Sequence, residues 1–136
     1  MPEDIRMRGG ESLAEALEGY LADWSRRTGI TVEVWALPAA EVPARVARGV
    51  LVAIREALAN VEQHSNATLV SIAVTAGRDG LRMTVSDHGS GFAGTGAAAP
   101  GIARMRAAFA EVDGSLTVNS VEGEGTTVSG VVPKRG

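Results

Sequence analysis

The chain lacks cysteine, which excludes a disulfide framework and any metal site built on thiolates. It also lacks a basic run, and its net charge is −3. Nucleic acid is therefore not expected as the main partner, because binding to a phosphate backbone needs clustered Lys and Arg. No apolar run approaches the length of a membrane span, and the first residues do not read as a signal peptide. We expect a soluble, cytoplasmic domain without direct membrane contact.

The length of 136 residues fits one domain with a core of its own. Residues 1–10 are polar and end in two glycines, so we interpret them as a linker remnant and residues 11–136 as the domain. Most of the 17 glycines follow residue 76. The second half of the chain should therefore depend on turns and on close approach of backbone segments.

Three stretches have apolar residues at helical spacing, and we predict helices over residues 12–27, from Pro43 through 64, and over 102–112. Ser12 and Glu15 form a capping-box pattern at the start of the first helix.

Five stretches are typical of strands, namely residues 31–36, 68–76, 81–86, 115–119 and 126–132. The second and third of these should form a hairpin around a turn at residues 77–80. Helices and strands are mixed without strict alternation, which predicts a two-layer α+β sandwich.

Polar side chains follow one ridge of the long helix, because Glu56, Asn60 and His64 lie four residues apart. This ridge borders the apolar face of the helix. Asn is disfavoured inside a helix because its side chain competes for backbone hydrogen bonds, so Asn60 needs a partner. A metal ion or a polar ligand would supply one, and an ordinary polar border of an amphipathic helix explains the ridge equally well.

A glycine motif, Asp87 to Gly91, directly follows an apolar strand. Gly89 and Gly91 allow a sharp turn and close approach to a ligand, and Asp87 can accept a hydrogen bond from an exocyclic amine. Alone, this motif favours a common turn.

Two further glycine motifs lie downstream. Gly101 follows a proline at a helix start, where free N–H groups and the helix dipole can bind phosphate. Alone, a Pro-Gly pair at this position is more often only a helix start. Residues 123–127 open the last strand and alone favour a hairpin turn.

The four motifs together are more specific than any one of them. In this order they resemble the nucleotide-binding fold shared by DNA gyrase, heat-shock chaperones, mismatch-repair ATPases and sensor histidine kinases. Within that group the chain is most similar to the catalytic ATP-binding domain of nitrate-sensor and DesK-type histidine kinases. The resemblance covers about residues 11–133 and is carried by residues 54–64, 87–92, 101–106 and 125–128. It implies a Bergerat-type fold, with a mixed sheet of about five strands covered on one face by about three helices.

The resemblance also implies ATP and Mg²⁺ as cofactors, with catalytic roles on the long helix. Asn60 would ligate Mg²⁺, a hard cation that prefers oxygen ligands. Glu56 would polarise or deprotonate the attacking group, or position a water, and His64 would face the phosphates.

The remaining implied roles concern the adenine and the phosphates. Asp87 would bind the adenine amine with Thr126 supporting it through a water, and Gly89 and Gly91 would let the base enter. Residues 92–100 would form the ATP lid. Backbone amides would hold phosphate oxygens at Gly101, Ile102 and Ala103.

This sequence departs from the family pattern mainly near the phosphates. Ala99 stands where a second glycine is frequent, Arg104 where this subfamily usually has glycine, and His88 where an acidic residue is common. Residues 92–100 contain no Lys or Arg. The expected lid therefore provides no cation for a triphosphate.

The resemblance implies a protein histidine kinase domain that donates the γ-phosphoryl to a His on a separate dimerisation domain. A response regulator would be the downstream partner, and the isolated chain would be a monomer. The whole kinase would be either a cytoplasmic protein or a membrane-bound sensor with this domain in its cytoplasmic part. His64 and His88 are the only histidines, and both lie in nucleotide motifs, so the isolated chain should not phosphorylate itself. The alternatives are a stand-alone anti-sigma-type serine kinase and a non-catalytic interaction module of the same fold.

Overall fold

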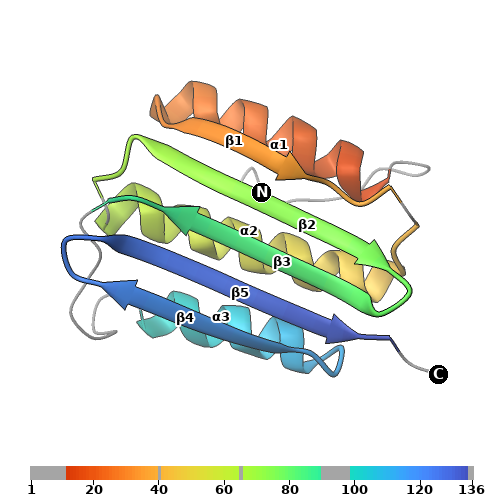
Figure 1. Ribbon diagram of the computed structural model, residues 1–136. Coiled ribbons are helices and arrows are strands. Elements are labelled where there is room, and N and C mark those ends of the chain that lie inside the picture. Colours follow the sequence, from red (N-terminus) through yellow and green to blue (C-terminus); the bar gives the residue numbers. More distant parts are fainter. Residues whose placement is uncertain (1–11, 40, 65, 90–98, 135–136) are drawn as a thin grey trace.

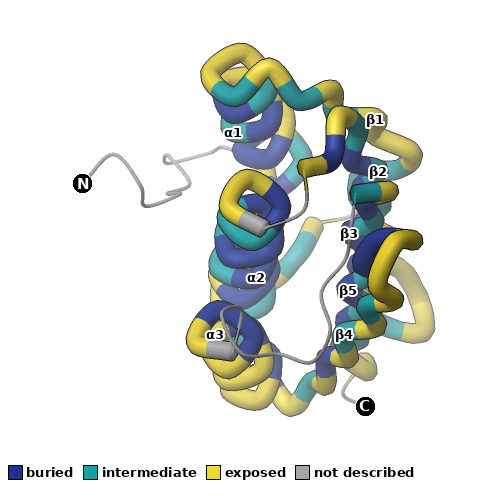
Figure 2. The backbone as a smooth tube through the Cα atoms, turned by 90° about the vertical axis from the view of Figure 1, so that its left-hand side faces the viewer, coloured by how far each residue is buried: buried dark blue, intermediate teal, exposed yellow. Residues whose placement is uncertain are grey.

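Three helices cover one face of a five-stranded sheet (Figures 1 and 2). The structure is a computed structural model, and it describes residues 12–39, 41–64, 66–89 and 99–134. The predicted two-layer α+β sandwich is confirmed.

The helices are α1 (Leu13–Thr28), α2 (Ala44–His64) and α3 (Ala99–Ala110). Ser12 caps α1: its hydroxyl accepts from the Glu15 amide at 3.1 Å, and its own amide donates to the Glu15 carboxylate at 3.0 Å. The predicted capping box is thus confirmed. Helix α3 begins three residues before the predicted start, so the last two residues of the expected lid are helical. The earlier start is compatible with Pro100, because proline is well tolerated in the first helical turn.

The strands are β1 (Thr31–Ala36), β2 (Leu69–Gly77), β3 (Gly80–Asp87), β4 (Ser115–Val121) and β5 (Gly125–Pro133). Their order in the sheet is β1-β2-β3-β5-β4. The β1–β2 pair is parallel and the other pairs are antiparallel, which makes the sheet mixed, as predicted. All five predicted strands form, and their ends differ from the predictions by at most two residues.

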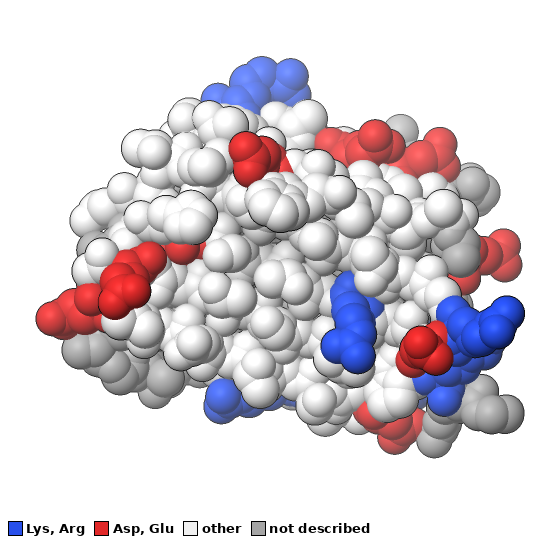
Figure 3. Space-filling view, in the orientation of Figure 1, with Lys and Arg blue, Asp and Glu red and all other residues white. Residues whose placement is uncertain are grey.

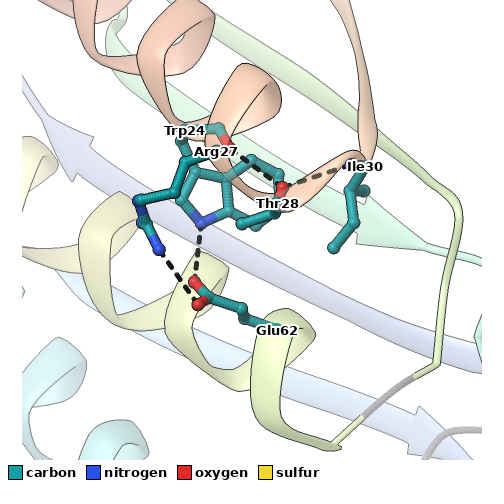
Figure 4. Close-up of polar contacts among 5 residues, drawn as sticks. All are labelled: Trp24, Arg27, Thr28, Ile30 and Glu62. Carbon is teal, nitrogen blue, oxygen red and sulfur yellow. Dashed lines mark hydrogen bonds and ion pairs between the residues drawn. The ribbon is translucent and has the colours of Figure 1, made fainter.

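Helix α1 is attached to α2 through the carboxylate of Glu62 (Figure 4). The Trp24 indole donates to one carboxylate oxygen at 3.0 Å, and the Arg27 guanidinium donates to the other at 3.1 Å. The rest of Trp24 is buried between the helices and the sheet. The indole thus contributes both apolar burial and a satisfied polar group at one helix contact.

The core lies between the helix layer and the sheet, and Figure 2 shows that the buried residues of both layers lie on the sides that face each other. None of the described helices covers the opposite face of the sheet. In Figure 3 the middle of this face is mostly uncharged, with acidic and basic side chains mainly toward the rim. None of the described helices is both long and apolar enough to span a bilayer.

Candidate functional site

The site lies at one end of the sandwich, where β3 ends and β5 begins. Asp87 is the last residue of β3, and its register partner on β5 is Thr126. Both are buried, with exposed fractions of 5% and 9%. The Thr126 hydroxyl lies 2.8 Å from the Ser120 hydroxyl of β4. A carboxylate and a hydroxyl are therefore held side by side at the edge of the core.

The Asp87 carboxylate faces a mixture of apolar and polar surroundings. Burial raises the pKa of this carboxyl above its ordinary value, while amide donors at Gly89 and Thr126 and the neighbouring His88 partly oppose the rise. The Gly89 amide donates to Oδ1 at 2.9 Å, so the turn predicted after Asp87 is present. A buried carboxylate with a raised pKa is a frequent mark of a binding site.

Gly125 makes the close approach of β5 to Asp87 possible. It has a φ of +112°, and a Cβ added to it would lie 2.2 Å from the Asp87 carbonyl oxygen. Only glycine fits such a position without displacing the backbone. In the sequence, Gly125 belongs to a motif but has no role of its own. The signal that could identify it is the glycine–threonine pair at the start of the strand.

A small cavity separates α2 from this end of the sheet. It is lined by residues Ala57, Asn60, Val61, Val85, Asp87, Val118, Thr126 and Val128. Its free space is about 10 Å³, roughly that of one water molecule. A larger group therefore enters only if some of the lining side chains move.

A much larger cavity, about 690 Å³, lies at the opposite end of the sandwich, between the start of α2 and the β2–β3 hairpin. It contains none of the predicted site residues. The smaller cavity is the relevant one here, because it joins Asn60, Asp87 and Thr126.

Asn60 lies half-buried at the margin of the small cavity, and its side chain makes no hydrogen bond with any other described residue. Its predicted need for a partner is therefore not met by the described protein groups. Gly101, in the first turn of α3, packs directly against the ridge. A Cβ added there would lie 3.3 Å from both Asn60 Oδ1 and Glu56 Oε1. The structure thus brings the predicted phosphate-binding helix start to the predicted catalytic ridge.

Glu56 is buried, with 6% of the residue exposed, and is held by two arginines. Arg104 of α3 binds both carboxylate oxygens, through Nε at 2.8 Å and Nη2 at 2.9 Å. Arg55 donates to Oε2 at 3.1 Å. The Glu56 hydrogen bonds raise the pKa of the Arg104 guanidinium further above its ordinary value. In the sequence, Arg104 stands out only as a departure from the family pattern.

The other predicted site residues are placed as follows. His64 is the last residue of α2, and its side chain lies outside the description, as do Gly91 and residues 92–98. Ile102 buries its side chain in the core. Ala103 is the fifth residue of α3, where the N–H is expected to bond within the helix. In the described first turn, the N–H groups without an intrahelical acceptor are therefore those of Ala99 and Gly101, because Pro100 has no N–H and the Ile102 N–H is expected to bond to the carbonyl before the helix.

Metal binding at this site would depend on few protein ligands. The described residues contain no group of three or more His, Asp or Glu side chains arranged to hold a metal. Both oxygens of Glu56 already accept from arginine. Asn60 Oδ1 is the available hard oxygen donor, which fits an ion such as Mg²⁺ that keeps most of its ligands from water and phosphate.

Residues 11–128 match the family described as the histidine kinase-like ATPase domain. The chain belongs to this family.

Two curated relatives are sensor histidine kinases. The chain is 33% identical to MctS of Rhizobium johnstonii, over 98% of this chain and 31% of that protein. It is 31% identical to LiaS of Bacillus subtilis, over 91% of this chain and 35% of that protein. The chain thus spans about a third of the length of these relatives.

Solved structures of the same fold include histidine kinase domains. One is the histidine kinase domain of a blue-light activated histidine kinase from Erythrobacter litoralis, with a TM-score of 0.75 and 23% identity, covering 93% of this chain and 63% of that one. Another is the ATP-binding domain of PrrB from Mycobacterium tuberculosis, with a TM-score of 0.67 and 21% identity, covering 92% of this chain and 96% of that one. These similarities confirm the fold.

Proposed function

We propose that residues 11–136 are the Mg²⁺–ATP-binding catalytic domain of a sensor histidine kinase, with residues 1–10 as a linker remnant. The domain would donate the γ-phosphoryl group to a His on a separate dimerisation domain. The observation that carries the proposal is the meeting of Asp87, Asn60 and Gly101 at one end of the sandwich. Family membership and the two sensor-kinase relatives support it.

Asp87 and Thr126 suit the adenine end of such a site. The Asp87 carboxylate can accept a hydrogen bond from the exocyclic amine, and the Thr126 hydroxyl can hold a water beside it. Apolar side chains of Val85, Val118 and Val128 line the same cavity and can cover the ring faces. Apolar walls with a few placed polar groups are typical of small-molecule sites.

Gly101 and Asn60 suit the phosphate end. The first amides of α3 carry the positive end of its dipole and can donate to phosphate oxygens. Asn60 Oδ1 would ligate Mg²⁺, and the bound ion would neutralise charge on the phosphates. Glu56 lies on the same ridge, where it can orient an attacking group.

A calorimetric titration with ATP and ADP tests the proposal. Asp87→Asn replaces the charged acceptor for the amine with an amide of the same size, and we expect it to weaken both nucleotides by about tenfold or more. Asp79→Asn makes the same chemical change in the exposed β2–β3 turn and should leave affinity unchanged. Wild-type affinity in a folded Asp87→Asn protein would contradict the adenine assignment.

The same titration with and without Mg²⁺ tests the phosphate end. Asn60→Ala should reduce the difference that Mg²⁺ makes to ATP affinity, because the proposed protein ligand is removed. An unchanged Mg²⁺ effect would assign Asn60 to an ordinary polar helix border.

A further inference from the structure

The phosphate end of the proposed site needs a positive side chain. ATP carries most of its negative charge on its outer phosphates, and residues 89–100 contain no Lys or Arg. Phosphoryl-transfer sites commonly place Arg, Lys and metal ions around that charge. Arg104 lies three residues after Gly101 on the same helix, which is slightly less than one turn.

The position of the Arg104 side chain fits this need. Side chains on a helix lean toward its N-terminus, so Arg104 leans toward the turn that contains Gly101. Its Nη2 lies 2.9 Å from Glu56 Oε1, and a Cβ on Gly101 would lie 3.3 Å from that same oxygen. The guanidinium therefore lies next to the proposed phosphate-binding turn.

Arg104 also has freedom to move. Its side chain is 57% exposed, whereas the Glu56 side chain that it binds is 8% exposed. The guanidinium side of this pair reaches solvent, so Arg104 can change partners without leaving a buried position. Arg55 donates to Oε2 of Glu56 at 3.1 Å and can keep a charge partner for the buried carboxylate when Arg104 leaves.

The local charge favours an anion beside Glu56. One buried carboxylate is shared by two guanidinium groups, Arg55 and Arg104, so the cluster carries an excess positive charge. A guanidinium that binds two carboxylate oxygens through Nε and Nη2 presents a planar fork that also matches two phosphate oxygens.

We propose that Arg104 determines specificity for the terminal phosphate: its guanidinium leaves Glu56 and binds the γ-phosphate of ATP. The inference rests on the proposed function and adds to it a residue that distinguishes ATP from ADP. Arg104 would supply from α3 the cation that the segment before the helix lacks.

Titration of each variant with ADP and with a non-hydrolysable ATP analogue, both with Mg²⁺, tests the inference. The quantity compared is the ratio of the two affinities, because a general disturbance of the site lowers both. Arg104→Ala should lower the preference for the ATP analogue by about tenfold, the scale of a lost charge-assisted interaction. Arg104→Lys keeps the charge without the fork and should give an intermediate ratio. Arg106→Ala, an exposed arginine on the same helix, should match wild type.

A second comparison separates direct contact from an effect through Glu56. In Arg104→Ala, Glu56 loses a neutralising partner and would itself repel a γ-phosphate. We therefore compare Glu56→Gln with the double variant Glu56→Gln/Arg104→Ala, in which that repulsion is absent. If Arg104 binds the phosphate, the ratio falls about tenfold from the single to the double variant. Equal ratios in the two proteins would overturn the inference.

The outcomes distinguish this inference from the proposed function. If the wild-type domain binds both nucleotides and the ratio does not depend on Arg104, the inference fails and the proposed function stands. If the wild-type domain binds neither nucleotide, both are overturned. Thermal unfolding of each variant is the control that the protein is folded when its ratio of ATP-analogue to ADP affinity is measured.

Discussion

The buried carboxylate of Asp87 costs folding stability, but the same carboxylate is the proposed acceptor for a ligand. Its carboxylate is buried at the end of β3, and burial raises its pKa above the ordinary value of 3.8. A buried charge costs stability unless its partners replace the lost water. Here the partners are backbone amides and no cation is bound to the carboxylate among the described residues. The remaining acceptor capacity is available for a ligand.

The raised pKa gives a pH-dependent stability. Between the ordinary and the raised value, the folded protein holds the Asp87 proton more tightly than the unfolded chain does. The contribution of the protonated Asp87 carboxyl to folding stability is therefore fully present at pH values below its ordinary pKa. It is lost as pH rises through the pKa of the folded protein. The Asn side chain in Asp87→Asn does not ionise, so no charge is buried at neutral pH. We therefore expect this variant to be as stable as wild type or more stable at neutral pH.

Urea denaturation at neutral pH and near pH 3.8 measures this effect. The difference in free energy of unfolding between Asp87→Asn and wild type should shrink at the lower pH. For Asp79→Asn, in the exposed turn, this difference should not depend on pH. A variant clearly less stable than wild type at neutral pH would show that the carboxylate stabilises the fold.

The site residues divide into those that sequence reasoning can predict and those that it cannot. Glu56, Asn60 and Asp87 could be predicted because helical spacing and a strand end place them. The pairing of Arg104 with Glu56 could not, because 48 residues separate them and the contact depends on how α3 crosses α2. The strict need for glycine at 125 likewise depends on the approach of one strand to another.

At the scale of elements, every helix and strand was predictable because each has a clear apolar period. Their ends were less so, since caps and turns decide them locally: α3 starts at Ala99 rather than 102. No local sequence pattern predicts that β5 lies between β3 and β4 in the sheet. That pairing matters most for the proposed function, because it brings Thr126 beside Asp87.

Helix α3 is seated on the sheet through Gly130 of β5, and this contact gives a prediction. A Cβ at Gly130 would lie 2.5 Å from Cε2 of Phe109, whose side chain is fully buried. Because the ring has no room to retreat, we expect Gly130→Ala to lower the free energy of unfolding by about 1–3 kcal/mol. Ser129→Ala, on the adjacent, opposite-facing position, should change it by less than about 0.5 kcal/mol.

Urea denaturation of both variants checks the prediction. Equal stabilities for Gly130→Ala and Ser129→Ala would show that α3 moves freely away from the sheet. In that case the substitution would be expected to weaken nucleotide binding, because Gly101 would move with α3 away from Asp87 on the sheet.

At the scale of the whole molecule, the proposed site gathers the end of α2, the start of α3, the end of β3 and the start of β5 (Figure 1). In the proposed function, its described groups hold the nucleotide and Glu56 orients the attacking group. Phosphoryl transfer also requires an acceptor held in line with the γ-phosphorus. The two histidines of the chain are poor acceptors by position: His64 ends α2, and His88 directly follows Asp87.

We therefore expect the isolated chain to form no stable phosphohistidine when it is incubated with labelled ATP. Adding the phosphoacceptor segment of its kinase as a separate polypeptide should give slow, acid-labile labelling of that segment, because positioning then depends on a weak encounter. Glu56→Gln should abolish this labelling, while Asp79→Asn should leave it unchanged. Acid-labile label on this chain alone, lost on substitution of His64 or His88, would show that the domain contains its own acceptor. Acid-stable label on a serine of an added partner would instead favour the anti-sigma-type kinase.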